Sequence, residues 1–284
     1  MRTVLFILLA ITQLASVAQD STAYYKEKAD LQYENKKFHE SIKNYKKALK
    51  FSPKNYEVVK SIADSKHKLE MFKGAINGYN EAEKLNSNDA ELYFNRGAAY
   101  VFINEYKKAL KDFNKSIELR PDFAEVYYYK GYSNASLNRY QEAIKSYSKA
   151  IELKPDYAAA YYNRGAAKAE ASSYEAGMKD FEIALQKDPK LENGRMNIAL
   201  SKLGLKQYEA SIEDFTYIID QRDENLARAY LYRGEALYEL DKKQEACRDW
   251  KIASNLEDEL AAQNVIDFCG ENTKKRKPTI DIVF

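Results

Sequence analysis

Few side chains in this 284-residue sequence are of the types that carry out catalysis or hold a metal ion. Its two histidines, His39 and His67, fall in polar stretches, and neither stands at metal-ligand spacing from a cysteine or carboxylate partner. We therefore expect both to be surface histidines. No glycine-rich phosphate loop follows a strand pattern, and no nucleophile with a plausible base is visible. The sequence predicts a protein that is not an enzyme and has no metal site and no cofactor.

The elements that must position the side chains are marked by regularly spaced prolines. The chain has five prolines, and four of them are Pro53, Pro121, Pro155 and Pro189. The last two intervals in this series are equal, and the first is twice as long. Proline lacks a backbone donor and disfavours the helical conformation of the preceding residue, so it tends to end helices. The shared period of about 34 residues indicates a helix–turn–helix unit that is copied along the chain.

Small and large residues recur at the same period. Small side chains let two helices approach closely, and large neighbours fill the space beside them. The small residue at the centre of the first helix of each copy is Ala29, Ala63, Gly97, Gly131, Gly165, Ala199 or Gly234. The large residue in the second helix is Tyr45, Tyr79, Phe113, Tyr147, Phe181, Phe215 or Trp250.

This order of aromatic, glycine, alanine, aromatic, alanine and proline positions resembles the tetratricopeptide repeat family. The resemblance covers residues 22–260 and implies an all-α fold, a right-handed superhelical solenoid of seven helix–turn–helix repeats. Ser87 and Asp223 stand where the family has proline. The seven copies are 22–55, 56–89, 90–123, 124–157, 158–191, 192–226 and 227–260, and a capping helix is expected over 261–270.

The segment 1–18 has the features of a secretory signal peptide. Arg2 precedes an apolar run over 4–11, and small residues at Ser16 and Ala18 suit cleavage after Ala18. The alternative is a membrane anchor, but this run is too short for the ~20 residues that a spanning helix needs. We expect an exported protein, periplasmic or secreted, that does not span a membrane.

Two cysteines remain, and an oxidising destination permits a disulfide between them. Cys247 and Cys269 lie equally far before and after Asp258, where a turn between two antiparallel helices is expected. Residues equidistant from such a turn face each other. The sequence therefore predicts a Cys247–Cys269 disulfide at the end of the solenoid, with two buried thiols as the alternative.

The charges of the sequence do not indicate a nucleic-acid partner, and its last residues do not indicate a folded element. The formal net charge is +2, so nothing points to nucleic acid. Lysine and glutamate alternate along second helices such as 105–119, which predicts a solvated outer face. Residues 271–284 are expected to form a flexible tail. The alternatives are that Ile280 to Phe284 add a strand to a partner or fold back onto the concave groove.

The resemblance also implies where a ligand would bind, because first helices line the concave groove in this family. The groove positions of the first two copies are charged, whereas those of copies three to seven are aromatic or aliphatic, with an amide beside several of them. Exposed aromatic groups often mark interaction sites. The candidate ligand-binding residues are Phe94, Asn95, Phe102, Tyr128, Tyr132, Tyr162, Asn163, Met196, Asn197, Leu200 and Leu231.

A scaffold that binds a peptide or partner protein in this groove is the function that these features favour. Lys26 and Lys60 are each followed on the next helical turn by an aspartate, which argues against a clamp for a terminal carboxylate. Two alternatives stay open: a glycan-binding module on the tyrosine-rich face, and a structural subunit of a cell-envelope assembly. The sequence does not indicate an oligomeric state.

Overall fold

The computed structural model describes residues 19–191, 193–221 and 225–270, together with Ile280, Ile282 and Phe284. The described residues form helices and no strand. The chain divides after Leu137 into two compact units, each described by itself below. The expected signal peptide, most of the expected tail and Asp223 lie outside the described residues.

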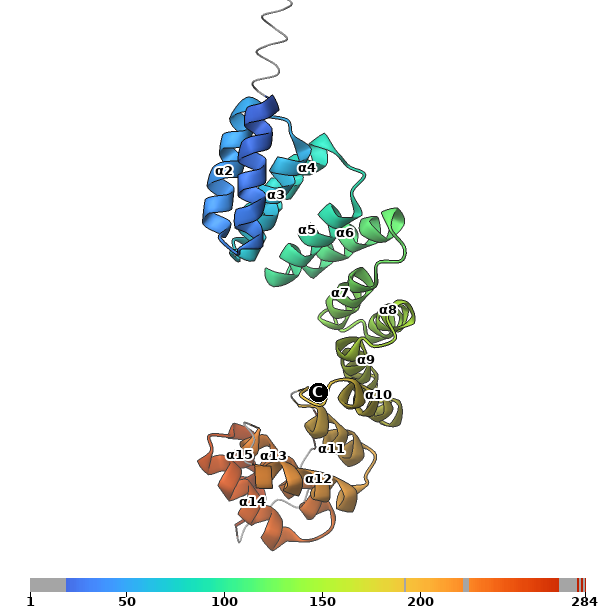
Figure 1. Cartoon of the computed structure of the whole chain (residues 1–284). Coiled ribbons are helices and arrows are strands. Elements are labelled where there is room, and N and C mark those ends of the chain that lie inside the picture. The colour runs from blue at the N-terminus through green and yellow to red at the C-terminus, as the bar shows by residue number, and fades with distance from the viewer. Residues whose placement is uncertain (1–18, 192, 222–224, 271–279, 281, 283) are drawn as a thin grey trace, which may run out of the picture. The chain divides into compact units, whose positions relative to one another are not determined.

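The first unit is a row of antiparallel helices (Figure 1). Each helix packs on the next one from α2 to α7, and α5 also contacts both α3 and α7. The first helices of the repeats therefore form one continuous layer. Helical residues 19–34 are followed by α2 (Phe38–Phe51), α3 (Tyr56–Lys68), α4 (Phe72–Leu85), α5 (Ala90–Phe102), α6 (Tyr106–Leu119) and α7 (Ala124–Ala135).

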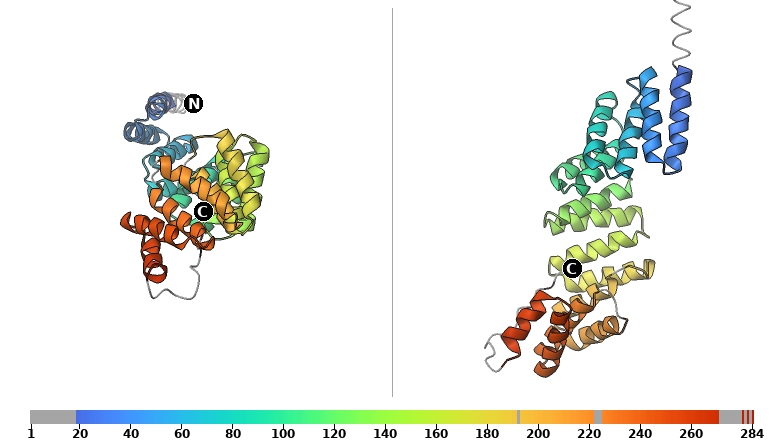
Figure 2. Two further views of the ribbon diagram at one scale, coloured as in Figure 1. Left: turned by 90° about the horizontal axis from the view of Figure 1, so that it is seen from below. Right: turned by 90° about the vertical axis from the view of Figure 1, so that its left-hand side faces the viewer.

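The second unit continues the same pattern, and α11 contacts both α9 and α13 (Figures 1 and 2). It ends in a single helix, α15, that packs on α14 at the place expected for a cap. Its helices are α8 (Tyr140–Leu153), α9 (Ala158–Glu170), α10 (Tyr174–Lys187), α11 (Gly194–Gly204), α12 (Tyr208–Gln221), α13 (Leu226–Glu239), α14 (Lys243–Asn255) and α15 (Glu259–Phe268).

The expected pairing of small with large residues holds the two helices of a repeat together. A Cβ atom added at Gly97 would lie 2.5 Å from Phe113, and one added at Gly234 would lie 2.6 Å from Trp250. Both aromatic side chains are fully buried. Glycine is therefore required at these positions because the helices approach more closely than a side chain allows. The described chain is an all-α repeat solenoid, as the sequence predicts.

The turns inside the repeats share a second regularity that the residue types do not reveal. One residue of each turn has a left-handed backbone, and six of these residues recur at the repeat period: Lys36, Glu70, Asn104, Asn138, Ser172 and Lys206. The next amide then bonds back to the helix, as from Met71 N to Lys66 O at 2.9 Å. This is the Schellman arrangement, which satisfies carbonyl groups at a helix end.

In three of the repeats, an arginine of the first helix pairs with a buried aspartate of the second helix. The bonds join Arg96 to Asp112, Arg164 to Asp180 and Arg233 to Asp249, with two nitrogen–oxygen distances of 2.7 to 2.9 Å in each pair. The interpretation of 105–119 as a solvated face is therefore wrong at Asp112, which is buried. The alternation of lysine and glutamate along 105–119 does not reveal this pair, because the arginine lies on the other helix.

Candidate functional site

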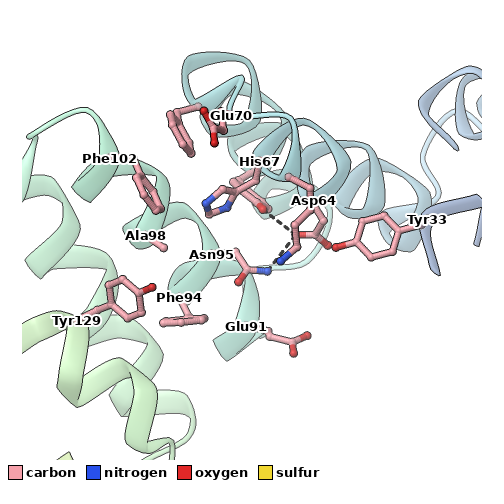
Figure 3. A pocket seen from close by; sticks show the side chains of 13 residues that line it. Tyr33, Asp64, His67, Glu70, Glu91, Phe94, Asn95, Ala98, Phe102 and Tyr129 are labelled. Atoms are coloured by element: carbon pink, nitrogen blue, oxygen red, sulfur yellow. Dashed lines mark hydrogen bonds between the residues drawn. The ribbon is translucent and has the colours of Figure 1, made fainter. Parts of the chain in front are cut away.

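A cavity of the first unit lies over its layer of first helices (Figure 3). It has a volume of about 580 Å³ and receives side chains from helical residues 19–34 and from α3, α4, α5 and α7, together with Glu70 in the turn after α3. We call it the α3–α5 pocket. Its lining residues are Tyr33, Asp64, His67, Lys68, Glu70, Phe72, Tyr79, Glu91, Phe94, Asn95, Ala98, Phe102 and Tyr129.

A partly buried carboxylate forms the polar centre of the α3–α5 pocket. The Oδ1 atom of Asp64 accepts hydrogen bonds from the Tyr79 hydroxyl at 2.7 Å and from Asn95 Nδ2 at 3.0 Å. Burial raises the pKa of Asp64, and these two donors oppose that shift. The hydroxyl of Tyr33 points toward the same carboxylate (Figure 3), and burial followed by the charge of Asp64 raises the pKa of Tyr33. The donors thus hold one carboxylate in a fixed orientation.

An aromatic platform stands beside this carboxylate. The rings of Phe72 and Phe102 are stacked, with centroids 4.6 Å apart and planes 4° from parallel. The ring of His67 makes a T-shaped contact with both, and its centroid lies 5.4 Å from that of Phe72 and 5.9 Å from that of Phe102. Phe102 is nonetheless 56% exposed, so the platform offers an open aromatic surface. Large exposed aromatic side chains of this kind contribute most of the binding energy at many interfaces.

His67 is the exception to the expectation of surface histidines. It lines the α3–α5 pocket, and burial followed by the charge of Lys68 lowers its pKa to about 4. The imidazole is therefore neutral at pH 7, where it packs as an aromatic ring.

The opposite wall is formed by Phe94 and Tyr129, whose ring centroids are 5.5 Å apart. Phe94 also packs on Phe123 at 4.8 Å, so it is anchored in the interior of the unit. The charged lining residues are three carboxylates, on Asp64, Glu70 and Glu91, and the ammonium group of Lys68. Glu91 is already paired with Lys60, at 2.9 Å, so the negative charge left beside the open rings belongs to Asp64 and Glu70. This charge suits a cationic group.

Three of the residues that the sequence singled out meet in the α3–α5 pocket, namely Phe94, Asn95 and Phe102. Tyr128 and Tyr132 lie on α7 but do not line it. Tyr132 is 40% exposed, and its ring centroid lies 6.4 Å from that of Tyr106. The two tyrosines therefore flank the site without forming it.

The other predicted residues lie in the second unit, where several are buried rather than open. Met196, Leu200 and Leu231 are at most 3% exposed and belong to one apolar cluster. The amides beside these groove positions are engaged within the protein. Asn197 Nδ2 donates to the Tyr162 hydroxyl at 3.0 Å, and Asn163 Nδ2 donates to the carbonyl of Ala159 at 2.8 Å.

Sequence reasoning missed Tyr33, His67, Phe72 and Tyr129 as pocket residues. One signal was available: His67 follows Asp64 by three positions on a helix, so the two share a face. The others come from neighbouring helices and turns, and only the stacking of repeats brings them together.

The described residues contain neither a candidate metal site nor a candidate membrane-spanning helix. No group of three or more histidine, cysteine, aspartate or glutamate side chains is placed to hold a metal ion in the part of the chain that the structure describes. Among the same residues, no helix is both long enough and apolar enough to cross a membrane.

Comparison with protein families agrees with this architecture. The family described as "TPR repeat" matches residues 63–101 and 131–172, and two families described as "Tetratricopeptide repeat" match residues 90–123 and 23–55. The chain is a tetratricopeptide repeat protein. No curated protein matches it. Its tetratricopeptide repeats explain both the even spacing of the prolines and the layer of first helices that carries the α3–α5 pocket.

Solved tetratricopeptide structures resemble parts of the chain. A structure of the MamA protein is 28% identical, with a TM-score of 0.57, and the match covers 61% of this chain and 94% of that one. A repeat protein from Parabacteroides merdae ATCC 43184 is 18% identical with a TM-score of 0.62, covering 87% and 98% of the two chains. YrrB, described as a TPR protein with an unusual peptide-binding site, is 21% identical with a TM-score of 0.54, covering 60% and 88%. The last two similarities concern the fold.

Proposed function

We propose that this protein is a non-enzymatic scaffold and that its α3–α5 pocket binds a peptide segment of a partner protein. The stacked Phe72–Phe102 platform beside the partly buried Asp64 carboxylate carries this proposal. A tetratricopeptide fold suits an interaction scaffold, and the YrrB description shows that a protein of this fold can bind peptides. The pocket adds the position and the chemistry of the contact.

The lining residues indicate what the peptide presents. An apolar side chain would lie against Phe102, which is the most open ring of the platform. A neighbouring lysine or arginine would point toward the carboxylates of Asp64 and Glu70, since Glu91 is already paired with Lys60. Rings close to a bound cation add a cation–π contribution. The proposed ligand is thus a segment with a basic residue next to an apolar one.

A photo-crosslinking amino acid at position 102 tests this proposal in the native cell. We expect it to trap a partner protein, whereas the same group at Tyr217, which is 48% exposed on α12 of the other unit, should not. With the partner identified, Phe102→Ala should weaken its binding about thirtyfold, as is typical of an interface hot spot. The affinity is measured by calorimetry, with Tyr217→Ala as the matched control.

A second variant separates the two halves of the proposed ligand. Asp64→Asn keeps an oxygen acceptor for Tyr79 and Asn95 but removes the negative charge. It should weaken the binding of a peptide that carries lysine and leave unchanged a peptide in which that lysine is replaced by norleucine. Equal loss for both peptides would contradict a charge-based site. Capture of glycans at Phe102 instead of a protein would overturn the proposal as a whole.

We further propose that the protein is exported. The pattern of residues 1–18 and the disulfide between Cys247 and Cys269 support this proposal, since disulfides persist mainly in oxidising compartments. The mature protein recovered from cells is expected to begin at Gln19 when its N-terminus is sequenced. A chain that retains Met1 and is recovered with the cytosolic fraction would contradict export.

A further inference from the structure

Three side chains close to the end of the chain pack on the second unit. Ile280, Ile282 and Phe284 are partly buried against the apolar cluster that contains Met196 and Leu200. In Figures 1 and 2 the end of the chain lies by α10 and α11, and not at the far side of α15, which precedes it in sequence. The segment therefore returns to a surface formed by earlier repeats.

Phe284 makes the most specific of these contacts. Its ring lies 6.2 Å from that of Phe181 with the planes 10° from parallel, and 6.0 Å from that of Tyr174. Its backbone N–H donates to Oε1 of Glu170 at 3.3 Å. These partners belong to the end of α9 and to α10, far earlier in the sequence. One aromatic residue is thus held by two rings and a backbone bond.

The spacing of the three apolar residues fits an extended peptide. They occupy every second position, so an extended backbone places them on the same side. The apolar cluster on which they pack contains Met196 and Leu200, which the sequence placed in the groove and which are almost fully buried. These three side chains therefore cover part of the apolar cluster of the second unit.

We propose that the surface of α9 to α11 near Glu170, Tyr174 and Phe181 is a second peptide-binding surface, and that Ile280, Ile282 and Phe284 of the same chain occupy it as an intramolecular ligand. The surface takes an extended segment with apolar side chains at alternate positions and an aromatic ring between Tyr174 and Phe181. A partner with this pattern binds only by displacing residues 280–284. A tethered segment competes at an effective concentration on the order of millimolar, so the displacement lowers the apparent affinity for such a partner.

The test uses a fluorescent peptide with the sequence of residues 277–284, KPTIDIVF, and the full chain. One protein is the wild type, and the other carries Ile280→Asp, Ile282→Asp and Phe284→Asp together. These three side chains lie outside the helices, so circular dichroism should show the same helical content in both proteins. We expect the triple variant to bind the peptide about tenfold more tightly than the wild type, or more, by fluorescence anisotropy.

Further substitutions in the triple variant place the site. Tyr174→Ala should weaken peptide binding, because Tyr174 contacts the ring of Phe284. Tyr106→Ala is the matched control, since Tyr106 begins α6 as Tyr174 begins α10 and lies in the other unit. It should leave peptide binding unchanged.

Three results would overturn the proposal. The first is equal affinity of the peptide for the wild type and the triple variant, and the second is no binding to either. The third is a wild-type dimer in light scattering that dissociates in the triple variant, because the occupant would then be a second copy. None of these results bears on Phe102, so they leave the proposed function of the α3–α5 pocket to its own test.

Discussion

Replacing Asp112 by alanine is expected to destabilise the first unit by about 3–5 kcal/mol. Asp112 on α6 binds Arg96 on α5 through two bonds, at 2.7 and 2.8 Å, and both side chains are buried. The variant leaves a guanidinium in the interior with only Asn80 and Glu83 as partners. The cost arises because a buried guanidinium that has lost its hydration also loses one of its two carboxylate counter-ions, while Glu83 remains.

The second repeat indicates a double variant that should restore the stability lost in Asp112→Ala. In the second repeat the positions equivalent to Arg96 and Asp112 are occupied by Ile62 and Gly78, so the fold accepts an uncharged pair there. Replacing both members of a buried ion pair by apolar residues is often neutral. The double variant Arg96→Met, Asp112→Leu should therefore stay within about 1 kcal/mol of the wild type.

Urea unfolding followed by circular dichroism measures these changes, and hydrogen exchange of α5 and α6 locates them. Asp122→Ala, an exposed aspartate in the next loop, is the matched control and should change stability by less than about 0.5 kcal/mol. A loss of less than about 1 kcal/mol for Asp112→Ala would mean that the pair behaves like a surface ion pair.

The sequence predicts the architecture well because repeat packing is local. Each small residue, such as Gly97, meets its large partner within the same repeat, so one period contains the essential contact. The left-handed turn residues escape such reasoning. Lys36, Glu70 and Lys206 share a backbone conformation and no residue type that favours it. The solenoid imposes that turn because both helices are already fixed by packing.

The candidate site could be predicted only in part, for a related reason. The position of Phe94, Asn95 and Phe102 on one helix follows from the repeat, and these residues do line the α3–α5 pocket. The sequence does not show which other helices reach the same place, so Tyr33 and Tyr129 were missed. The sequence also does not show whether a residue at a groove position is exposed or buried by other parts of the chain. Met196 and Leu200 have the pattern of groove residues, yet they lie in a cluster against which residues far along the chain pack.

Reducing the Cys247–Cys269 disulfide is expected to destabilise the end of the second unit by about 3 kcal/mol. The structure joins these two cysteines, as their equal spacing from Asp258 predicts. The bond ties the last residues of α15 to α14 and limits the conformations of the unfolded loop between them. A helix at the end of a solenoid has one neighbouring helix, so this cross-link contributes a large part of its stability.

Hydrogen exchange with and without dithiothreitol measures this effect along the chain. Reduction should remove protection from Glu259–Phe268 and lower it in Lys243–Asn255, while α9 and α10 stay protected. The variant Cys247→Ser, Cys269→Ser should behave like the reduced protein and show no response to dithiothreitol, which controls for effects of the reagent. Unchanged protection of α15 in both cases would show that the packing of its own buried residues Ala261 and Phe268 holds the cap without the cross-link. Because repeats unfold nearly independently, a loss that spread to α9 would instead indicate that the cap stabilises the whole unit.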